Sequence, residues 1–266
     1  MGDIHFTKMS ATGNDFIVID NRSGILNCDR DKEFLSRICQ RKVSVGADGV
    51  ILLESSKRCD FKYVHMNSDG SIAEMCGNGS RAISYFAHSK GIVAQNAKFE
   101  ILGKIYQVKI NGNMVTTDFN SPVDQKFNLG IVSESYLQEG GFINSGVPHL
   151  VLFVKDVNAV DVANIGRKYR HQKEFSEGTN VDFVQVERSN FLKVRTFERG
   201  VEGETLACGT GAVASAIISN KKGLTTPPIT VQYAGGELGI DFKKNFKNIT
   251  LTGKVDLIYT GIIHFT

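Results

Sequence analysis

Two cysteine-containing turns, both rich in glycine, stand half a chain apart. Residues 76–79 read CGNG and residues 208–211 read CGTG. Their separation is 132 residues (208 − 76 = 132), which is close to half of the 266-residue chain. Each turn is followed by a helix-like run that ends in Lys-Gly, at 90–91 and at 222–223. A repeat of this period predicts two copies of one domain rather than a solenoid of short units.

Other landmarks repeat in the same order at nearly the same offset. Gly13 and Gly146 each precede a short apolar run, and so do Gly46 and Gly178. These runs are rich in Val, Ile and Phe, which is typical of buried strands. Residues 212–218 are apolar nearly all round, as in a helix that is enclosed on every side. The sequence therefore predicts an α+β fold of two pseudo-symmetric domains, each a mixed β-sheet or barrel wrapped around a central helix.

The repeat also sets the expected domain limits. We expect an N-terminal repeat over residues 1–120, joined by a C-terminal strand at 256–266, and a C-terminal repeat over 121–255. A chain of 266 residues is long enough to give each repeat its own core. Two more polar helices are expected at 29–39 and 157–169.

Composition argues against several classes of protein for this chain. The basic residues are scattered and the net charge is only +3, so no nucleic-acid partner is predicted. No apolar stretch approaches the roughly 20 residues of a membrane span, and no export signal opens the chain. Five cysteines without close-spaced pairs indicate reduced thiols in the cytoplasm and no metal site.

A cysteine at the first turn of a buried helix has a chemical use. The free backbone N–H groups there favour an anion, so such a thiol is expected to have a lowered pKa and to act as a base. The same N–H groups bind carboxylates, and glycines let the backbone approach a ligand closely. Two such elements acting on one amino-acid substrate suit proton removal from one face and delivery to the other, which inverts a stereocentre without a cofactor. The remaining cysteines, Cys28, Cys39 and Cys59, are expected to be structural.

The motifs around these turns resemble a known family. Residues 67–81, NSDGSIAEMCGNGSR, are similar to the first signature of the diaminopimelate epimerases, and residues 198–211, ERGVEGETLACGTG, to their second cysteine motif. GNDF at 13–16 resembles the opening of that family, and Pro-His at 148–149 its histidine motif. The resemblance covers essentially the whole chain. It implies a cytoplasmic, cofactor-independent homodimer that interconverts LL- and meso-2,6-diaminopimelate for lysine and peptidoglycan synthesis.

The resemblance also implies roles for single residues. Cys76 and Cys208 would be the two acid/base residues, and His149 and Glu198 would assist proton transfer. The backbones of four residues would hold the reacting carboxylate: Gly77, Asn78, Gly209 and Thr210. Four side chains would bind the substrate, chiefly at its distal end: Asn14, Asn67, Asn180 and Arg199.

Two departures from the family pattern leave other substrates open. Val147 stands where many relatives have Asn, and residues 101–104 read ILGK in place of a Thr-Ala-Asn-Gly-like turn. The alternatives are a cysteine-pair racemase of glutamate, histidine or proline, and a PhzF-like isomerase, which would not need paired cysteines. A non-catalytic amino-acid-binding protein would explain the anion sites but not two thiols in equivalent places.

Overall fold

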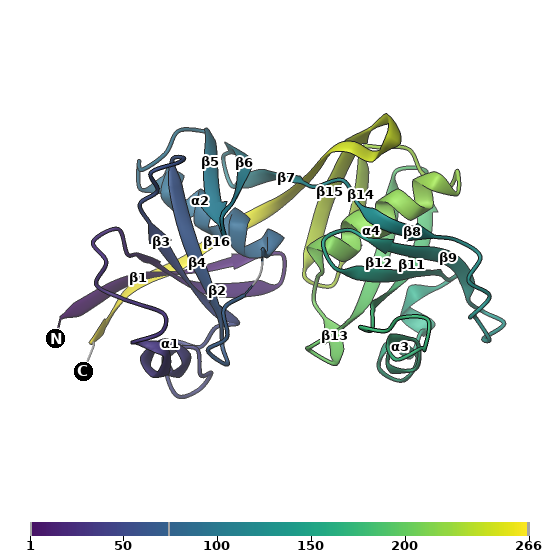
Figure 1. Cartoon of the computed structure of the whole chain (residues 1–266), viewed down its shortest axis with the longest axis horizontal. Helices are drawn as coiled ribbons and strands as arrows, with labels where there is room; N and C mark the ends of the chain where they lie inside the picture. The colour runs from purple at the N-terminus through teal and green to yellow at the C-terminus, as the bar shows by residue number, and fades with distance from the viewer. Residues whose placement is uncertain (1, 74, 265–266) are drawn as a thin grey trace. The chain divides into compact units, whose positions relative to one another are not determined.

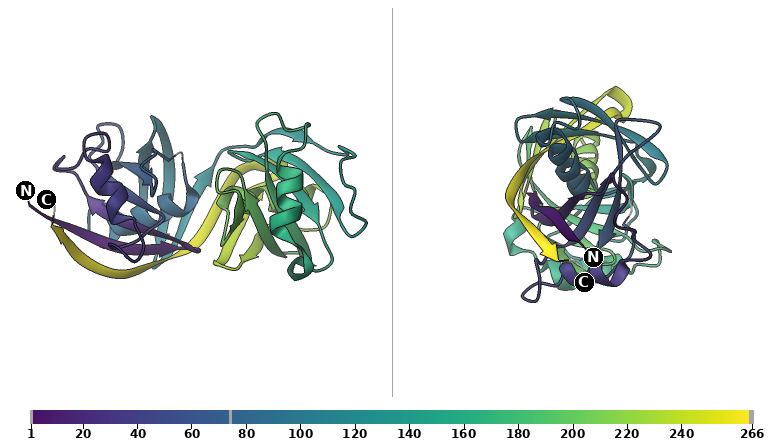
Figure 2. Two further views of the ribbon diagram at one scale, coloured as in Figure 1. Left: turned by 90° about the horizontal axis from the view of Figure 1, so that it is seen from below. Right: turned by 90° about the vertical axis from the view of Figure 1, so that its left-hand side faces the viewer.

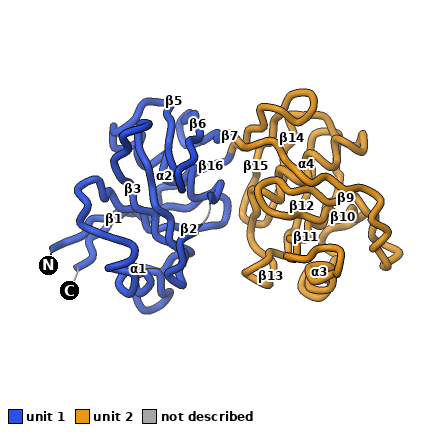
Figure 3. Tube along the Cα trace, viewed as in Figure 1, with its two compact units in different colours: residues 1–118, 253–266 blue, residues 119–252 orange. Residues whose placement is uncertain are grey.

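The computed structural model describes residues 2–73 and 75–264. It divides into two compact units (Figure 3), one of residues 1–118 with 253–266 and one of residues 119–252. The long last strand, β16 (Lys247–His264), contributes its first part to unit 2 and the remainder to unit 1.

Unit 1 is a closed sheet of eight strands around one helix. Its strands follow one another in chain order and are β1 (Asp3–Ala11), β2 (Asn14–Asp20), β3 (Gly49–Glu54), β4 (Phe61–Asn67), β5 (Asn96–Ile101), β6 (Lys104–Asn111) and β7 (Met114–Phe119), followed by β16. The sheet closes because β16 also pairs with β1, from Asp3 opposite His264 to Ala11 opposite Val255. The two ends of the described chain therefore lie side by side (Figure 2).

The helix α2 (Gly77–Ser89) lies inside this ring of strands (Figure 1). Its apolar residues Ala82, Ile83 and Phe86 belong to a buried core shared with the surrounding strands. A second core lies between the sheet and the outer helix α1 (Lys32–Ile38), which contributes Phe34, Leu35 and Ile38.

Unit 2 also arranges its strands around one helix, α4 (Gly209–Lys221). From β16 its strands run in the order β15 (Gly236–Lys243), β14 (Ile229–Tyr233), β12 (Phe191–Glu198), β11 (Asn180–Arg188), β10 (Pro148–Phe153), β9 (Gln138–Asn144) and β8 (Val123–Lys126). The short strand β13 (Gly203–Thr205) pairs with β12, and the turn η2 (Lys244–Phe246) joins β15 to β16. The helix α4 is apolar nearly all round, and residues 211–219 are buried, because strands enclose it.

The pairing of the strands confirms the predicted duplication. In unit 1 the pairs β1–β2, β2–β3, β3–β4 and β4–β5 are antiparallel, parallel, antiparallel and parallel. In unit 2 the pairs β9–β10, β10–β11, β11–β12 and β12–β14 follow the same sequence. The predicted fold of two repeats, each a mixed sheet wrapped around a central helix, is therefore confirmed.

The outer helices differ in extent from the sequence prediction. Where one helix was expected at 157–169, the chain forms a 3-10 turn, η1 (Val157–Ala159), and then α3 (Val162–Arg170). The carboxylate of Asp156 caps the turn, and that of Asp161 accepts from the backbone N–H of Asn164 and caps the helix. An acidic N-cap favours a new helix start, so the segment divides between these two residues. Similarly, α1 begins after Asp31 rather than at residue 29.

No helix in the part of the chain that the structure describes combines the length and the apolar character needed to cross a membrane.

One buried histidine lies beneath the central helix of unit 1. His65, in β4, is only 4% exposed, and its Nδ1 atom has no hydrogen-bond partner among the described residues. Its ring meets Phe16 edge-on and lies against Gly79. Burial lowers the pKa of His65 to about 4, with an opposing effect from Asp48.

This pKa makes the stability of the protein depend on pH. An unfolded histidine binds its proton near pH 6.5, so as the pH falls the unfolded state gains this proton before the folded state does. We expect the free energy of unfolding to fall by roughly 3 kcal/mol between pH 6.5 and 4 on account of His65. Urea unfolding at several pH values measures this free energy. It should fall less steeply with decreasing pH for His65→Leu than for the control His171→Gln, whose ring is exposed. Equal slopes for the two variants would contradict this role of His65.

Candidate active site

The two central helices begin in the same way. Cys76 is the N-cap of α2 and Cys208 is the N-cap of α4, both with extended backbones. The Cys76 sulfur accepts from the backbone N–H of Gly79 at 3.5 Å, and the Cys208 sulfur accepts from that of Gly211 at 3.4 Å. The fold thus places one thiol at the first turn of the central helix in each unit, among the N–H groups that a helix leaves unbonded at its start.

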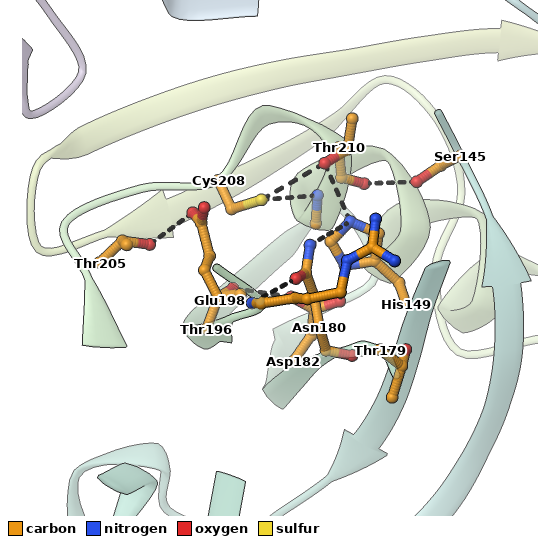
Figure 4. Close-up of polar contacts among 12 residues, drawn as sticks. Ser145, His149, Thr179, Asn180, Asp182, Thr196, Glu198, Thr205, Cys208 and Thr210 are labelled. Atoms are coloured by element: carbon orange, nitrogen blue, oxygen red, sulfur yellow. Dashed lines mark hydrogen bonds and ion pairs between the residues drawn. The ribbon is translucent and has the colours of Figure 1, made fainter. Parts of the chain in front are cut away.

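In unit 2 this thiol ends a line of polar side chains (Figure 4). His149 comes from β10, Asp182 from β11 and Thr210 from the first turn of α4. His149 Nδ1 is 2.7 Å from Asp182 Oδ2, and His149 Nε2 is 2.9 Å from Thr210 Oγ1. The Thr210 oxygen is in turn 3.4 Å from the Cys208 sulfur. His149 and Asp182 are completely buried.

The remaining unit 2 residues surround this line. The Asn180 side-chain nitrogen lies 3.3 Å from His149 Nε2, and its oxygen accepts from the backbone N–H of Arg199 at 2.7 Å. The Arg199 guanidinium donates to the carbonyl of Glu177 at 3.2 Å. Glu198 ends β12 and accepts from the Thr205 hydroxyl at 2.6 Å.

Burial changes the acidity of the Cys208 thiol in the direction opposite to our expectation. Burial raises the pKa of Cys208 well above its usual value, and the charges of Glu198 and Asp182 raise it further. The contact with Thr210 and the hydrogen bond from the backbone of Gly211 lower it but do not compensate. The expectation of a lowered pKa was therefore wrong for Cys208, because loss of solvent and two nearby carboxylates outweigh the helix start. A thiol whose pKa is raised in this way is suited to donate its proton.

Glu198 shares the same buried environment. Burial raises its pKa, and hydrogen bonds with Thr205 and with the Cys208 thiol lower it. A carboxyl group held in this way is suited to exchange a proton with an adjacent sulfur.

In unit 1 the first turn of α2 is held by amide and guanidinium groups instead. The Asn78 side chain donates to Asn14 at 2.6 Å, and Asn14 donates to Asp48 at 3.0 Å. Arg81 is completely buried and donates to the carbonyl of Gly77 and to Thr12, both at 3.1 Å, and also to Asn78. Burial lowers the pKa of Arg81 to about 10, whereas the Cys76 charge acts to raise it.

The structure therefore brings most of the site residues predicted from sequence into two groups. In unit 1, Asn14 and Asn78 are bonded to each other beside Cys76 and Gly77 at the start of α2. Asn67 ends β4, and its side chain donates to Ser71 in the next turn at 2.9 Å. The unit 2 group consists of His149, Asn180, Glu198, Arg199, Cys208, Gly209 and Thr210.

Sequence reasoning missed two buried charged residues of these groups. Asp182 follows Asn180 by two residues in β11, so both side chains lie on the same face of the strand. Arg81 lies five residues after Cys76, in the second turn of α2. Because side chains alternate between the two faces of a strand, the position of Asp182 two residues after Asn180 could have identified it from the sequence. Among the described residues, no three His, Cys, Asp or Glu side chains gather as a metal site would require.

Two solved structures of the same fold belong to a PhzF-family protein and a probable proline racemase. A Bacillus anthracis phenazine biosynthesis protein of the PhzF family matches with a TM-score of 0.77, covering 100% of both chains at 13% identity. A probable proline racemase from Agrobacterium radiobacter K84 matches with a TM-score of 0.70, covering 99% of this chain and 93% of that one at 13% identity. At such low identity these matches show the fold alone.

Comparison by sequence is more specific. The profile of the family described as diaminopimelate epimerase matches residues 6–123 and 141–258, once in each repeat. The diaminopimelate epimerase of Aquifex aeolicus (strain VF5) is 43% identical over 272 residues, which cover 97% of each chain. That of Chlorobaculum tepidum is 39% identical over 261 residues, covering 96% of this chain and 99% of the relative. The chain therefore belongs to the diaminopimelate epimerase family.

Proposed function

We propose that this protein is a cofactor-independent two-base epimerase that interconverts LL- and meso-2,6-diaminopimelate. The observation that carries the proposal is the identical capping of both central helices by cysteine sulfur. Family membership supports the reaction and the substrate. It also supports the wider assignment to lysine biosynthesis in the cytoplasm.

The first turns of α2 and α4 would hold the reacting end of the substrate. The backbone N–H groups of Gly77, Asn78, Gly209 and Thr210 belong to these turns. Such groups bind a carboxylate and stabilise the negative charge that develops on it as the α-proton leaves. Inversion requires one thiol at each face of the α-carbon.

The two thiols would have different roles in each direction of the epimerisation. The raised pKa of Cys208 suits it to deliver a proton while Cys76 removes one, and the roles exchange in the reverse direction. His149 and Glu198 would exchange protons with the thiols. His149 contacts Thr210, which lies next to the Cys208 sulfur, and Glu198 is hydrogen-bonded to the Cys208 thiol. Both contacts support this assignment.

The distal end of the substrate would be bound by Asn14, Asn67, Asn180 and Arg199. The guanidinium of Arg199 is suited to a carboxylate because its planar fork forms two parallel bonds. Asn180 fixes the backbone of Arg199 through the 2.7 Å bond to its N–H group, which supports a shared role. The PhzF-family protein and the probable proline racemase match this chain at 13% identity, so these matches support the fold and neither alternative activity.

The proposed homodimer would cover exposed apolar side chains of β16. Four residues of β16 are large, apolar and 42–54% exposed: Leu257, Ile258, Tyr259 and Ile262. Sedimentation equilibrium should show a dimer for the unchanged chain and a monomer for the double variant Ile258→Asp, Tyr259→Asp. A monomeric unchanged chain at micromolar concentration would overturn this part of the proposal.

Removal of either thiol should abolish epimerisation. Each of Cys76→Ala and Cys208→Ala removes one acid/base group, and such groups contribute roughly 10²–10⁴-fold to a rate. The control is Cys28→Ala, because burial raises the pKa of Cys28 to about 11 and its thiol stays protonated at neutral pH. Turnover of LL-diaminopimelate is measured, with circular dichroism to check the fold. Near-normal turnover in either active-site variant would show that its cysteine is not an acid/base residue.

Replacement of Arg199 by Lys should impair substrate selection. An ammonium group cannot form two parallel bonds, and the loss of one charge-assisted bond costs about 1.5–3 kcal/mol, or roughly 10- to 150-fold in kcat/KM. The matched control is Arg188→Lys, a change of the same kind at an exposed position of β11. The kcat/KM ratio between diaminopimelate and amino acids without a distal carboxylate is the measurement. An unchanged ratio in Arg199→Lys would exclude Arg199 from the distal site.

A further inference from the structure

The buried pair of Asp182 and His149 is costly for the fold. Both side chains are completely buried, and their 2.7 Å contact lies beneath the first turn of α4. The helix leaves room for it, because a Cβ atom on Gly211 would lie only 2.6 Å from Asp182 Oδ1. Polar pairs removed from water in this way usually add little stability compared with apolar residues of the same size.

Unit 1 shows that the fold does not need this pair. In the parallel pair β10–β11, His149 lies opposite Asn180 and Val151 opposite Asp182. In the equivalent pair β2–β3, Phe16 lies opposite Gly49 and Val18 opposite Ile51. The positions of His149 and Asp182 are thus occupied by Phe16 and Ile51 in the other repeat. The same architecture forms there with apolar residues, so the pair in unit 2 calls for a functional explanation.

We propose that Asp182 is a positioning residue that fixes the tautomer of His149 and so makes Thr210 and His149 a proton relay for Cys208. The inference rests on the proposed function, since it concerns how one thiol of that reaction changes its protonation state. Asp182 does not touch the substrate and acts through His149.

The directions of the hydrogen bonds support a relay. An ionised carboxylate only accepts, so His149 Nδ1 carries a hydrogen and donates it to Asp182. The neutral ring then has its lone pair on Nε2, which accepts from the Thr210 hydroxyl at 2.9 Å. The Thr210 oxygen, 3.4 Å from the Cys208 sulfur, can then accept from the thiol when the thiol hydrogen turns from Glu198 to Thr210. Figure 4 shows the contacts from Cys208 to Thr210 and from Thr210 to His149.

The transfer conserves protons and charge. The S–H bond of Cys208 breaks as an O–H bond forms on Thr210, while the original O–H bond of Thr210 breaks as an N–H bond forms at His149 Nε2. The result is a Cys208 thiolate and an imidazolium that faces the Asp182 carboxylate. The reverse transfer restores the thiol.

The surroundings hold Asp182 in this role. The Thr196 hydroxyl donates to its other oxygen, Oδ1, at 2.7 Å, and Tyr233 lies beside Thr196 with the two hydroxyl oxygens 3.5 Å apart. The titratable groups that face the relay are Glu198, Cys208 and Tyr233, each of which senses the charge of Asp182. Asp182 therefore has one oxygen fixed by Thr196 and the other available to orient the imidazole.

The tautomer is tested directly by ¹⁵N NMR of the histidine-labelled full-length protein, with His149→Gln to assign the signal. We expect a hydrogen on Nδ1 in the unchanged chain and on Nε2 in Asp182→Asn, whose side-chain amide donates to Nδ1. Asp182→Asn should also lower kcat for diaminopimelate by roughly 10²–10⁴-fold with little change in KM. The matched control is Asp241→Asn in the exposed part of β15, with neither effect expected.

A second pair of variants tests the relay without altering the buried pair. Thr210→Val removes the hydroxyl and should lower kcat while the tautomer stays unchanged, and Thr210→Ser should restore the rate. An Nε2–H tautomer in the unchanged chain, or full kcat in Thr210→Val, would overturn the relay. Failure of the proposed function would give a different result from failure of the relay. The unchanged chain would then be inactive on diaminopimelate but would still carry the Nδ1–H tautomer.

Discussion

The hydrogen bond from a helix N–H group to a cysteine sulfur is the interaction on which the rest of this structure depends. It occurs twice, at Cys76 and at Cys208, and each time the helix that it starts is the core of a unit. A helix enclosed by strands has its first N–H groups away from bulk water, so these groups need partners. The thiols supply one partner each, and the remaining N–H groups are the ones that we propose to bind the substrate carboxylate.

The two repeats share this cap but surround it with opposite charges. The start of α2 is held by Arg81, Asn78 and Asn14, whereas the start of α4 faces Asp182 and Glu198. The carboxylates of Glu198 and Asp182 add to the raised pKa of the Cys208 thiol, whereas the start of α2 has a buried guanidinium in place of such carboxylates. The surroundings of two turns that began as copies have thus become different, which suits the proposed roles of one base and one acid.

Much of the architecture could be predicted from the sequence, because the duplication is visible in the spacing of glycines and cysteines. The apolar run at 212–218 correctly indicated an enclosed helix. What could not be predicted depends on burial by residues distant in the sequence. The raised pKa of Cys208 follows from Glu198 and Asp182, which lie 10 and 26 residues earlier, and from strands that close over the site. The break in the helix expected at 157–169 depends on Asp161, which caps α3. Its carboxylate starts a new helix there, although the apolar pattern of the segment favours one continuous helix.

The central claim is that two different groups act on the two faces of one α-carbon. Epimerisation of LL-diaminopimelate in heavy water tests it most directly, with early samples analysed by mass spectrometry. Two bases predict that the meso product carries deuterium at the inverted carbon from the first turnovers, while recovered LL substrate still carries protium. A single base serving both faces would return the original proton to the product or place deuterium equally in both pools, and either result would contradict this account.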